Sequence, residues 1–144
     1  MPTVRQLMRP GVREVRDDEP IAGALRSMRD AEVGLLLVVD RSGRSKGVVS
    51  KTDLLTHVAD HGGLEVEVRS ITSSELYTVG ADEPVSAAIR KMAEEGVHHV
   101  VVVDQGEPIG VFGAWDLVRA AGEGRLVLQS GGAGVRGPRS GPGV

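Results

Sequence analysis

The sequence contains no cysteine and very few aromatic residues. With no cysteine among 144 residues, a disulfide framework, a thiolate metal site and a cysteine nucleophile are all excluded. Aromatic residues make up only 2% of the chain, so aliphatic side chains must fill the core. The stacking platforms that bind single-stranded nucleic acid are missing for the same reason.

The chain also lacks an excess of positive charge and a long apolar run. Its formal net charge is −3, whereas a nucleic-acid surface needs a basic face. No apolar run approaches the roughly 20 residues that span a bilayer, and the N-terminus has no signal-peptide core. We therefore expect a cytoplasmic protein whose 40% hydrophobic residues form one compact domain, or two small repeats that share a core.

One pattern occurs twice, at Gly47–Asp53 (G-V-V-S-K-T-D) and Gly110–Asp116 (G-V-F-G-A-W-D). Each copy reads as a glycine, a short buried strand, a turn, and an aspartate in the first turn of a helix. Upstream, D-E-P-I at 18–21 aligns with D-E-P-V at 82–85, and V-V-D at 38–40 aligns with 102–104. The period is longer than that of a solenoid unit, so it indicates one fold unit used twice.

The segments around these motifs alternate between helix and strand patterns. Apolar residues recur at helical spacing in 21–31 and 85–93, and continuous apolar runs at 35–39 and 100–103 predict strands buried on both faces. Each run is followed by a polar turn and a return strand, at 47–49 and 109–112. Short helices are expected at 3–8, from 50 to about 61, and at 116–121. The pattern predicts an α/β fold of short helices packed on small sheets.

Two copies in register resemble a tandem pair of CBS domains (a Bateman module), the adenosine-nucleotide-sensing module named after cystathionine β-synthase. The resemblance covers roughly residues 4–121. It implies two β-α-β-β-α repeats related by a pseudo-two-fold axis, with clefts between them. The expected boundaries are 1–61 for the first repeat with an N-terminal helix, 62–67 for a linker, 68–121 for the second repeat, and 122–144 for a disordered tail rich in Gly and Pro.

Ser50 and Asp53 stand as S-x-x-D at the start of a helix. A capping box, in which the two residues satisfy orphan N–H groups, explains both. The same turn also presents a positive helix end to an anion, and a carboxylate beside it can accept ribose hydroxyls. The resemblance implies that Asp53 holds a ribose and Ser50 lies near phosphate, with Thr52 as a further candidate.

The second copy of the motif departs from this pattern. Asp116 is kept, but Gly113 stands where the first copy has Ser50, and Trp115 stands where it has Thr52. The hydroxyl for phosphate is lost, and the bulk of the single tryptophan is expected to narrow or fill the pocket. A ligand role for Asp116 is therefore expected to be weaker than one for the aspartate of the first copy.

His98 and His99 begin the second hairpin. Neighbouring strand residues point to opposite faces, so the pair cannot easily share a metal. One interpretation is a buried, hydrogen-bonded histidine beside an exposed one. The other follows from the similar V-H-R-L stretch in the nucleotide-sensing subunit of the AMP-activated kinase, which supplies His and Arg to phosphate. That resemblance implies a phosphate contact for His98, with His99 as a partly charged replacement for the arginine.

Two further groups carry weaker signals. His57 and His61 have the spacing of metal ligands on a helix, but no H-E-x-x-H pattern accompanies them, so a surface pair near a helix C-terminus is favoured and no metal is predicted. A cluster of arginines near the start suits an anion, although a solvated face is the favoured interpretation. These arginines are Arg5, Arg9, Arg13 and Arg16.

No catalytic motif, P-loop or dinucleotide fingerprint is present, so three functions of different class remain. The favoured hypothesis is a non-catalytic regulatory module without a cofactor, which senses cellular energy by binding AMP, ADP, ATP or S-adenosylmethionine. The alternative is a structural dimerisation module that has lost ligand binding. The weakest is an enzyme that uses the four histidines.

The resemblance also implies partners. It predicts a homodimer formed by the short helices and, because no effector domain is attached, a separate effector protein that reads the signal. An exposed apolar patch usually marks such an interface. The apolar residues assigned to it are Leu54, Leu55, Val58, Leu117, Val118, Ala120 and Ala121.

Overall fold

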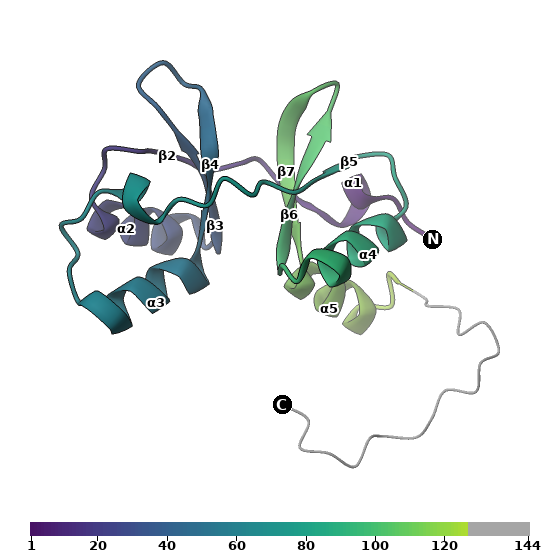
Figure 1. Cartoon of the computed structure of the whole chain (residues 1–144). Helices are drawn as coiled ribbons and strands as arrows, with labels where there is room; N and C mark the ends of the chain where they lie inside the picture. The colour runs from purple at the N-terminus through teal and green to yellow at the C-terminus, as the bar shows by residue number, and fades with distance from the viewer. Residues whose placement is uncertain (127–144) are drawn as a thin grey trace, which may run out of the picture.

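Each predicted apolar run forms the central strand of a small sheet (Figure 1). In the first sheet, β3 (Leu35–Val39) pairs antiparallel with β4 (Ser45–Ser50) and parallel with β2 (Glu14–Arg16). Every residue of β3 is buried, as expected for a strand covered on both faces. This computed structural model describes residues 1–126, so residues 127–144 of the predicted tail lie outside the described residues.

The second sheet repeats this arrangement. β6 (His99–Asp104) pairs antiparallel with β7 (Glu107–Gly113) and parallel with β5 (Thr78–Gly80). The two sheets lie side by side, one in each lobe of Figure 1, and an apolar layer packs between them. That layer contains Leu35, Leu37, Val39, Val48 and Val101. The predicted α/β architecture of two repeats is confirmed.

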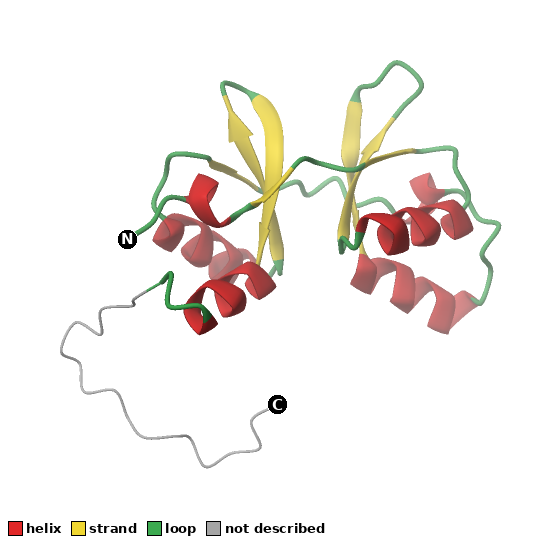
Figure 2. Ribbon diagram, turned by 180° about the vertical axis from the view of Figure 1, so that it is seen from behind, coloured by secondary structure: helices red, strands yellow, loops and turns green. Residues whose placement is uncertain are grey.

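The amphipathic segments form helices on the outer face of each sheet (Figure 2). The first lobe carries α2 (Ile21–Ala31) and α3 (Lys51–His61), and the second carries α4 (Val85–Glu95) and α5 (Ala114–Gly122). Pro20 and Pro84 occupy the N-cap positions of α2 and α4. Among the helices of residues 1–126, none is long and apolar enough to cross a membrane.

The lobes exchange their first helical turns. Helix α1 (Val4–Leu7) belongs to the first sequence repeat, but Val4 is fully buried in the core of the second lobe. Conversely, the 3-10 helix η1 (Val68–Ile71) buries Val68 in the core of the first lobe. The sequence repeats therefore do not coincide with the packing units, and neither lobe has a complete core without the other repeat.

The glycine that opens each motif lies where a connecting segment crosses the hairpin. Gly110 pairs with Pro10 of β1 (Arg9–Pro10), and a Cβ at Gly110 would lie 2.6 Å from the carbonyl oxygen of Arg9. In the first lobe, a Cβ at Gly47 would overlap the carbonyl oxygen of Ser73. Both positions need glycine because another backbone approaches closely.

The end of the described chain packs against the second lobe. Gly122 is the last residue of α5, and residues 122–126 are the part of the predicted tail that the structure describes. Leu126 is 6% exposed and joins the core of that lobe. Arg125 donates a hydrogen bond to the carbonyl oxygen of Gln6 at 2.8 Å.

Candidate functional site: two clefts between the repeats

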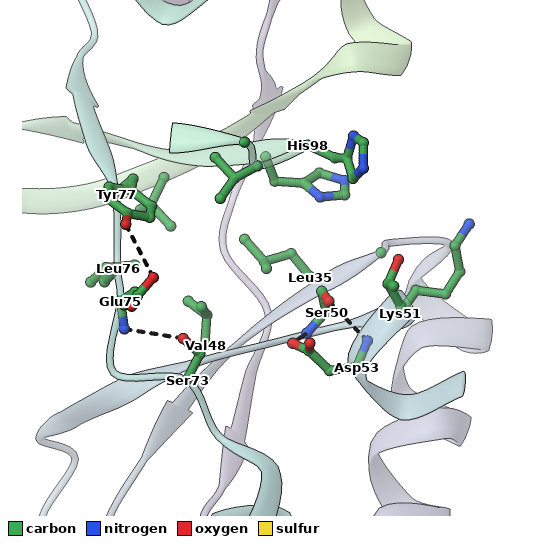
Figure 3. A pocket seen from close by; sticks show the side chains of 16 residues that line it. Leu35, Val48, Ser50, Lys51, Asp53, Ser73, Glu75, Leu76, Tyr77 and His98 are labelled. Atoms are coloured by element: carbon green, nitrogen blue, oxygen red, sulfur yellow. Dashed lines mark hydrogen bonds between the residues drawn. The ribbon is translucent and has the colours of Figure 1, made fainter. Parts of the chain in front are cut away.

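The first cleft lies between the start of α3 and the start of β6 (Figure 3). It has a volume of about 330 Å³. Ser50 and Asp53 line one side, and His98 lies across the cavity from them in Figure 3. Thr52 and His99 line the same cleft. The structure thus brings together five of the six predicted site residues.

Ser50 and Asp53 form the predicted capping box. The Oδ2 atom of Asp53 accepts a hydrogen bond from the backbone N–H of Ser50 at 3.0 Å, and the hydroxyl of Ser50 accepts one from the N–H of Asp53 at 3.1 Å. The second carboxylate oxygen, Oδ1, receives no hydrogen bond from residues 1–126. The carboxylate can therefore cap α3 and accept a ligand hydroxyl at the same time.

Four lining residues with polar or charged side chains were missed by the sequence interpretation: Lys51, Ser73, Glu75 and Tyr77. The hydroxyl of Tyr77 donates to Glu75 at 3.1 Å. Hydrogen bonding to the carboxylates of Glu95 and Glu75 raises the pKa of Tyr77 to about 12. Residues 73–77 occupy in the second repeat the position that residues 9–13 occupy in the first. The arginines at 9 and 13, which the sequence analysis noted as suited to an anion, were therefore the one available signal that this segment lines a cleft.

The second cleft is the pseudo-symmetric counterpart of the first, with the same volume of about 330 Å³. It is lined by Asp116, Gly113 and Trp115, and by Arg9 and Arg13 from the first repeat. Trp115 is 69% exposed, so the expectation that it fills the pocket is wrong. Three residues line both clefts and form a shared wall, namely Gly34, Leu35 and His99.

Asp116 differs sharply from its counterpart in the first cleft. It is only 4% exposed, and both of its oxygens are engaged. Oδ2 accepts from the N–H of Gly113 at 2.7 Å, and Oδ1 accepts from the guanidinium of Arg119 at 2.6 Å. Gly113, the N-cap residue of α5, has no side chain that could accept a hydrogen bond in return. Both oxygens of the Asp116 carboxylate therefore stabilise the fold, and neither is free to bind a ligand.

His99 explains why glycine replaces serine in the second motif. His99 and Gly113 are direct partners in the sheet, and a Cβ at Gly113 would lie 2.6 Å from Cδ2 of the imidazole. The equivalent pair in the first lobe is Leu35 and Ser50. The imidazole therefore occupies the space that a side chain at position 113 would need.

The two neighbouring histidines have different surroundings. Burial lowers the pKa of His99, and the nearby charge of Asp116 opposes this shift. The imidazole of His99 makes no hydrogen bond within residues 1–126, so it is not the buried, hydrogen-bonded histidine of the first interpretation. His98 is exposed at the edge of the first cleft.

His57 and His61 lie side by side, with ring centroids 4.9 Å apart. Within the described residues, no group of three or more potential metal ligands is present. The buried Nε2 atom of His57 has no hydrogen-bond partner in the same part of the chain. This geometry supplies two histidines but no third ligand.

Residues 4–60 and 68–123 each match the CBS domain family. The chain is a CBS-domain protein. The two matches cover most of the sequence and correspond to the two sequence repeats described above.

Three similar proteins illustrate the relationship. A solved structure of an uncharacterized conserved protein from Pyrococcus horikoshii is 26% identical, with a TM-score of 0.77, and the alignment covers 89% of this chain and 96% of that one. A CBS domain protein from Pyrobaculum aerophilum, complexed with AMP, is 29% identical, with a TM-score of 0.74 and coverage of 86% and 98%. An uncharacterized protein from Methanopyrus kandleri is 28% identical over 95 residues, which is 64% of this chain but only 48% of the relative's length.

Proposed function

We propose that this CBS pair is a regulatory module, rather than a catalyst, that binds an adenosine-containing nucleotide in the first cleft. The observation that carries the proposal is the meeting of Ser50, Asp53 and His98, from both repeats, around one cavity of about 330 Å³. Small-molecule sites typically have about this volume or more. The relative from P. aerophilum, similar over nearly its whole length, was solved with AMP. AMP, ADP, ATP and S-adenosylmethionine are the candidate ligands, and sensing of cellular energy is the proposed role.

Each polar residue of the cleft has a chemical part in this proposal. The free Oδ1 of Asp53 accepts a ribose hydroxyl, and charge-assisted hydrogen bonds of this type are the strong ones. Ser50, Thr52 and Lys51 lie at the N-terminus of α3, where a phosphate is electrostatically favoured. His98 faces the same region from the second repeat. Apolar side chains offer a surface for the base, namely Leu35, Val48, Leu76, Val97 and Val101.

A thermal-unfolding screen with the four candidate ligands tests the proposal. A ligand present at a hundred times its Kd stabilises the folded protein by about 2.7 kcal/mol. We expect at least one of the four to raise the melting temperature. A screen in which none of them does so would favour the dimerisation module without ligand.

Isothermal titration of two matched variants then tests the residues. Asp53→Asn keeps an oxygen for the helix cap but loses the charge, and we expect it to weaken nucleotide binding about tenfold, the equivalent of roughly 1.4 kcal/mol. Asp116→Asn removes the corresponding charge from the second cleft and should leave this affinity unchanged. Equal effects of the two variants would contradict the assignment of the first cleft.

A second candidate function, assembly into a two-fold homodimer that an effector protein recognises, is favoured by exposed apolar residues on α3 and α5. Leu55 is 62% exposed and Val118 is 54% exposed. The predicted patch was wrong in two members, because Leu54 and Ala120 are 0% and 1% exposed and belong to the cores. Exposed apolar groups on these two helices, one in each lobe, suit an isologous interface. Light scattering should give twice the 15.1 kDa mass of the chain, and a 15 kDa particle at micromolar concentration would contradict the dimer.

A further inference from the structure

The two clefts offer opposite charge to a ligand. The first is lined by one lysine, Lys51, against the two carboxylates of Asp53 and Glu75. The second is lined by two arginines, Arg9 and Arg13, against one carboxylate that is already paired with a third arginine outside the lining. Because the cavities have the same volume, their ligand preference is set by charge and by hydrogen-bonding groups rather than by size.

The second cleft lacks the groups that hold a ribose. Both oxygens of Asp116 are engaged, at 2.7 Å and 2.6 Å, and Gly113 has no hydroxyl. A ribose placed there would lose its hydrogen bonds to water without gaining equivalent ones, and leaving polar groups unpaired is costly. The chemistry of this cleft therefore selects against a nucleoside.

The two arginines are held at the cleft with donors to spare. Nη1 of Arg9 donates to the carbonyl oxygen of Glu32 at 2.6 Å, and Nε of Arg13 donates to the hydroxyl of Ser27 at 3.0 Å. A guanidinium has five N–H donors, and these are the only hydrogen bonds that either side chain makes within residues 1–126. Both cations are therefore restrained beside the cavity and retain N–H groups for an anionic oxygen.

Apolar surface completes the cavity. The indole of Trp115 lies at its rim, and aliphatic residues form its walls, namely Ala31, Val33, Leu35 and Val111. The imidazole of His99 lies between the two clefts and makes no hydrogen bond within the described chain. A ligand in this cavity meets two cations, Arg9 and Arg13, and apolar groups over most of its remaining surface.

We propose that the second cleft binds a small organic anion that is not a nucleoside: a phosphate or carboxylate group carried on a compact apolar body. Arg9 and Arg13 bind the anionic group by charge-assisted hydrogen bonds. Trp115 and the aliphatic walls bury the apolar body. The proposal does not require nucleotide binding in the first cleft. Together with the proposed function, it means that this CBS pair responds to two chemically different ligands.

Trp115 provides a probe of this cleft alone, because it is the single tryptophan of the chain and does not line the first cleft. We would titrate the full chain with phenyl phosphate and excite only tryptophan. A saturable change in emission is expected. Inorganic phosphate, which lacks the apolar body, should bind more weakly, and uncharged adenosine should cause no change. Benzoate in place of phenyl phosphate distinguishes a carboxylate from a phosphate as the preferred group.

Charge-matched variants test the residues. Arg9→Gln with Arg13→Gln should weaken phenyl phosphate binding at least tenfold. The control, Arg26→Gln with Arg90→Gln, removes the same charge from exposed positions that line neither cleft, and it should change the affinity less than threefold. Melting temperatures of both double variants establish that they remain folded.

Three results would overturn the proposal. The first is that phenyl phosphate and benzoate produce neither a change in Trp115 emission nor heat in calorimetry. The second is that the two double variants bind phenyl phosphate with equal affinity. The third is that adenosine changes Trp115 emission with the same affinity as the anions. Asp53→Asn separates this proposal from the nucleotide site. It should reduce nucleotide binding in calorimetry and leave the response of Trp115 to phenyl phosphate intact.

Discussion

The two clefts show how a different pair of residues across the hairpin changes the role of a motif that is repeated within one chain. In the first lobe Leu35 lies opposite Ser50, and the serine caps the helix while leaving one oxygen of Asp53 free. In the second, His99 lies over Gly113, and Asp116 is buried with both oxygens bonded. The same motif therefore presents a carboxylate in one repeat and uses it for stability in the other.

If the two aspartates have these separate roles, removing Asp116 should destabilise the protein more than removing Asp53. Asp116→Ala leaves the N–H of Gly113 and the guanidinium of Arg119 without their acceptor, and we expect the free energy of unfolding to fall by about 2–3 kcal/mol. Asp53→Ala removes one half of a capping box on a more exposed helix, and should cost about 1 kcal/mol. Denaturant unfolding of both variants measures the difference, and equal losses would show that the two carboxylates stabilise the fold to the same extent.

Converting the second cleft toward the first tests the role of the histidine. Gly113→Ser places a Cβ against the imidazole of His99, and overpacking of this kind costs about 1–3 kcal/mol. Adding His99→Leu recreates the pair found in the first lobe, so the double variant should recover most of the loss. A double-mutant cycle measures this coupling. Additive effects of the two substitutions would show that the imidazole is not the reason for glycine at 113.

Much of the fold follows from local patterns in the sequence. The run of five apolar residues at Leu35–Val39 predicts a doubly covered strand, and the S-x-x-D pattern predicts the capping box that the structure contains. The repeat itself predicts two similar lobes. These features depend on neighbouring residues, so the sequence order is sufficient to find them.

The features that were missed depend on contacts between distant segments. The exchange of α1 and η1 between lobes places Val4 in a core some 80 residues away in sequence. Glu75 and Tyr77 join the first cleft because the connecting segment crosses the hairpin there, with Ser73 beside Val48. The burial of Asp116 depends on Arg119 and on the imidazole across the sheet. No periodicity or spacing encodes such contacts.

His99, in the shared wall of the two clefts, makes the stability of the protein depend on pH. His99 has a lowered pKa because it is buried, with smaller lowering contributions from His98 and Lys51, and an opposing one from Asp116. The unfolded state therefore takes up this proton first as the pH falls. The contribution of His99 to the free energy of unfolding is fully present above the ordinary histidine pKa of 6.5. It is lost as the pH falls toward the lower pKa of His99 in the folded protein. We expect unfolding free energy to decline between about pH 7 and 5.

Two variants isolate this titration. His99→Gln should flatten the decline, whereas His61→Gln, at an exposed helix end, should not change it. The carboxylates with lowered pKa values, Asp18 beside Arg16 and Asp40 beside Ser42, titrate below 3.8 and do not contribute in this window. If the free energy of unfolding has the same pH dependence in the wild-type protein and in both variants, His99 is not the cause of the decline.

The smallest effect is expected where the helices before the two hairpins end. Both α2 and α4 end at a residue in the left-handed region, with φ of 54° at Glu32 and 68° at Gly96. A non-glycine residue there costs roughly 1–2 kcal/mol, and Glu32→Gly removes this strain but adds flexibility to the unfolded chain that costs about 0.4–1 kcal/mol. The net gain should be about 0.5 kcal/mol, or a rise of about 2 °C in the melting temperature. The carbonyl oxygen that accepts from Arg9 is retained, so the second cleft keeps its arginine.

The reverse change, Gly96→Ala, should lower the melting temperature by a comparable or larger amount. If Glu32→Gly destabilised the protein instead, the side chain of Glu32 would have a stabilising role that outweighs its backbone strain, and the two repeats would differ in their helix ends as well as in their clefts.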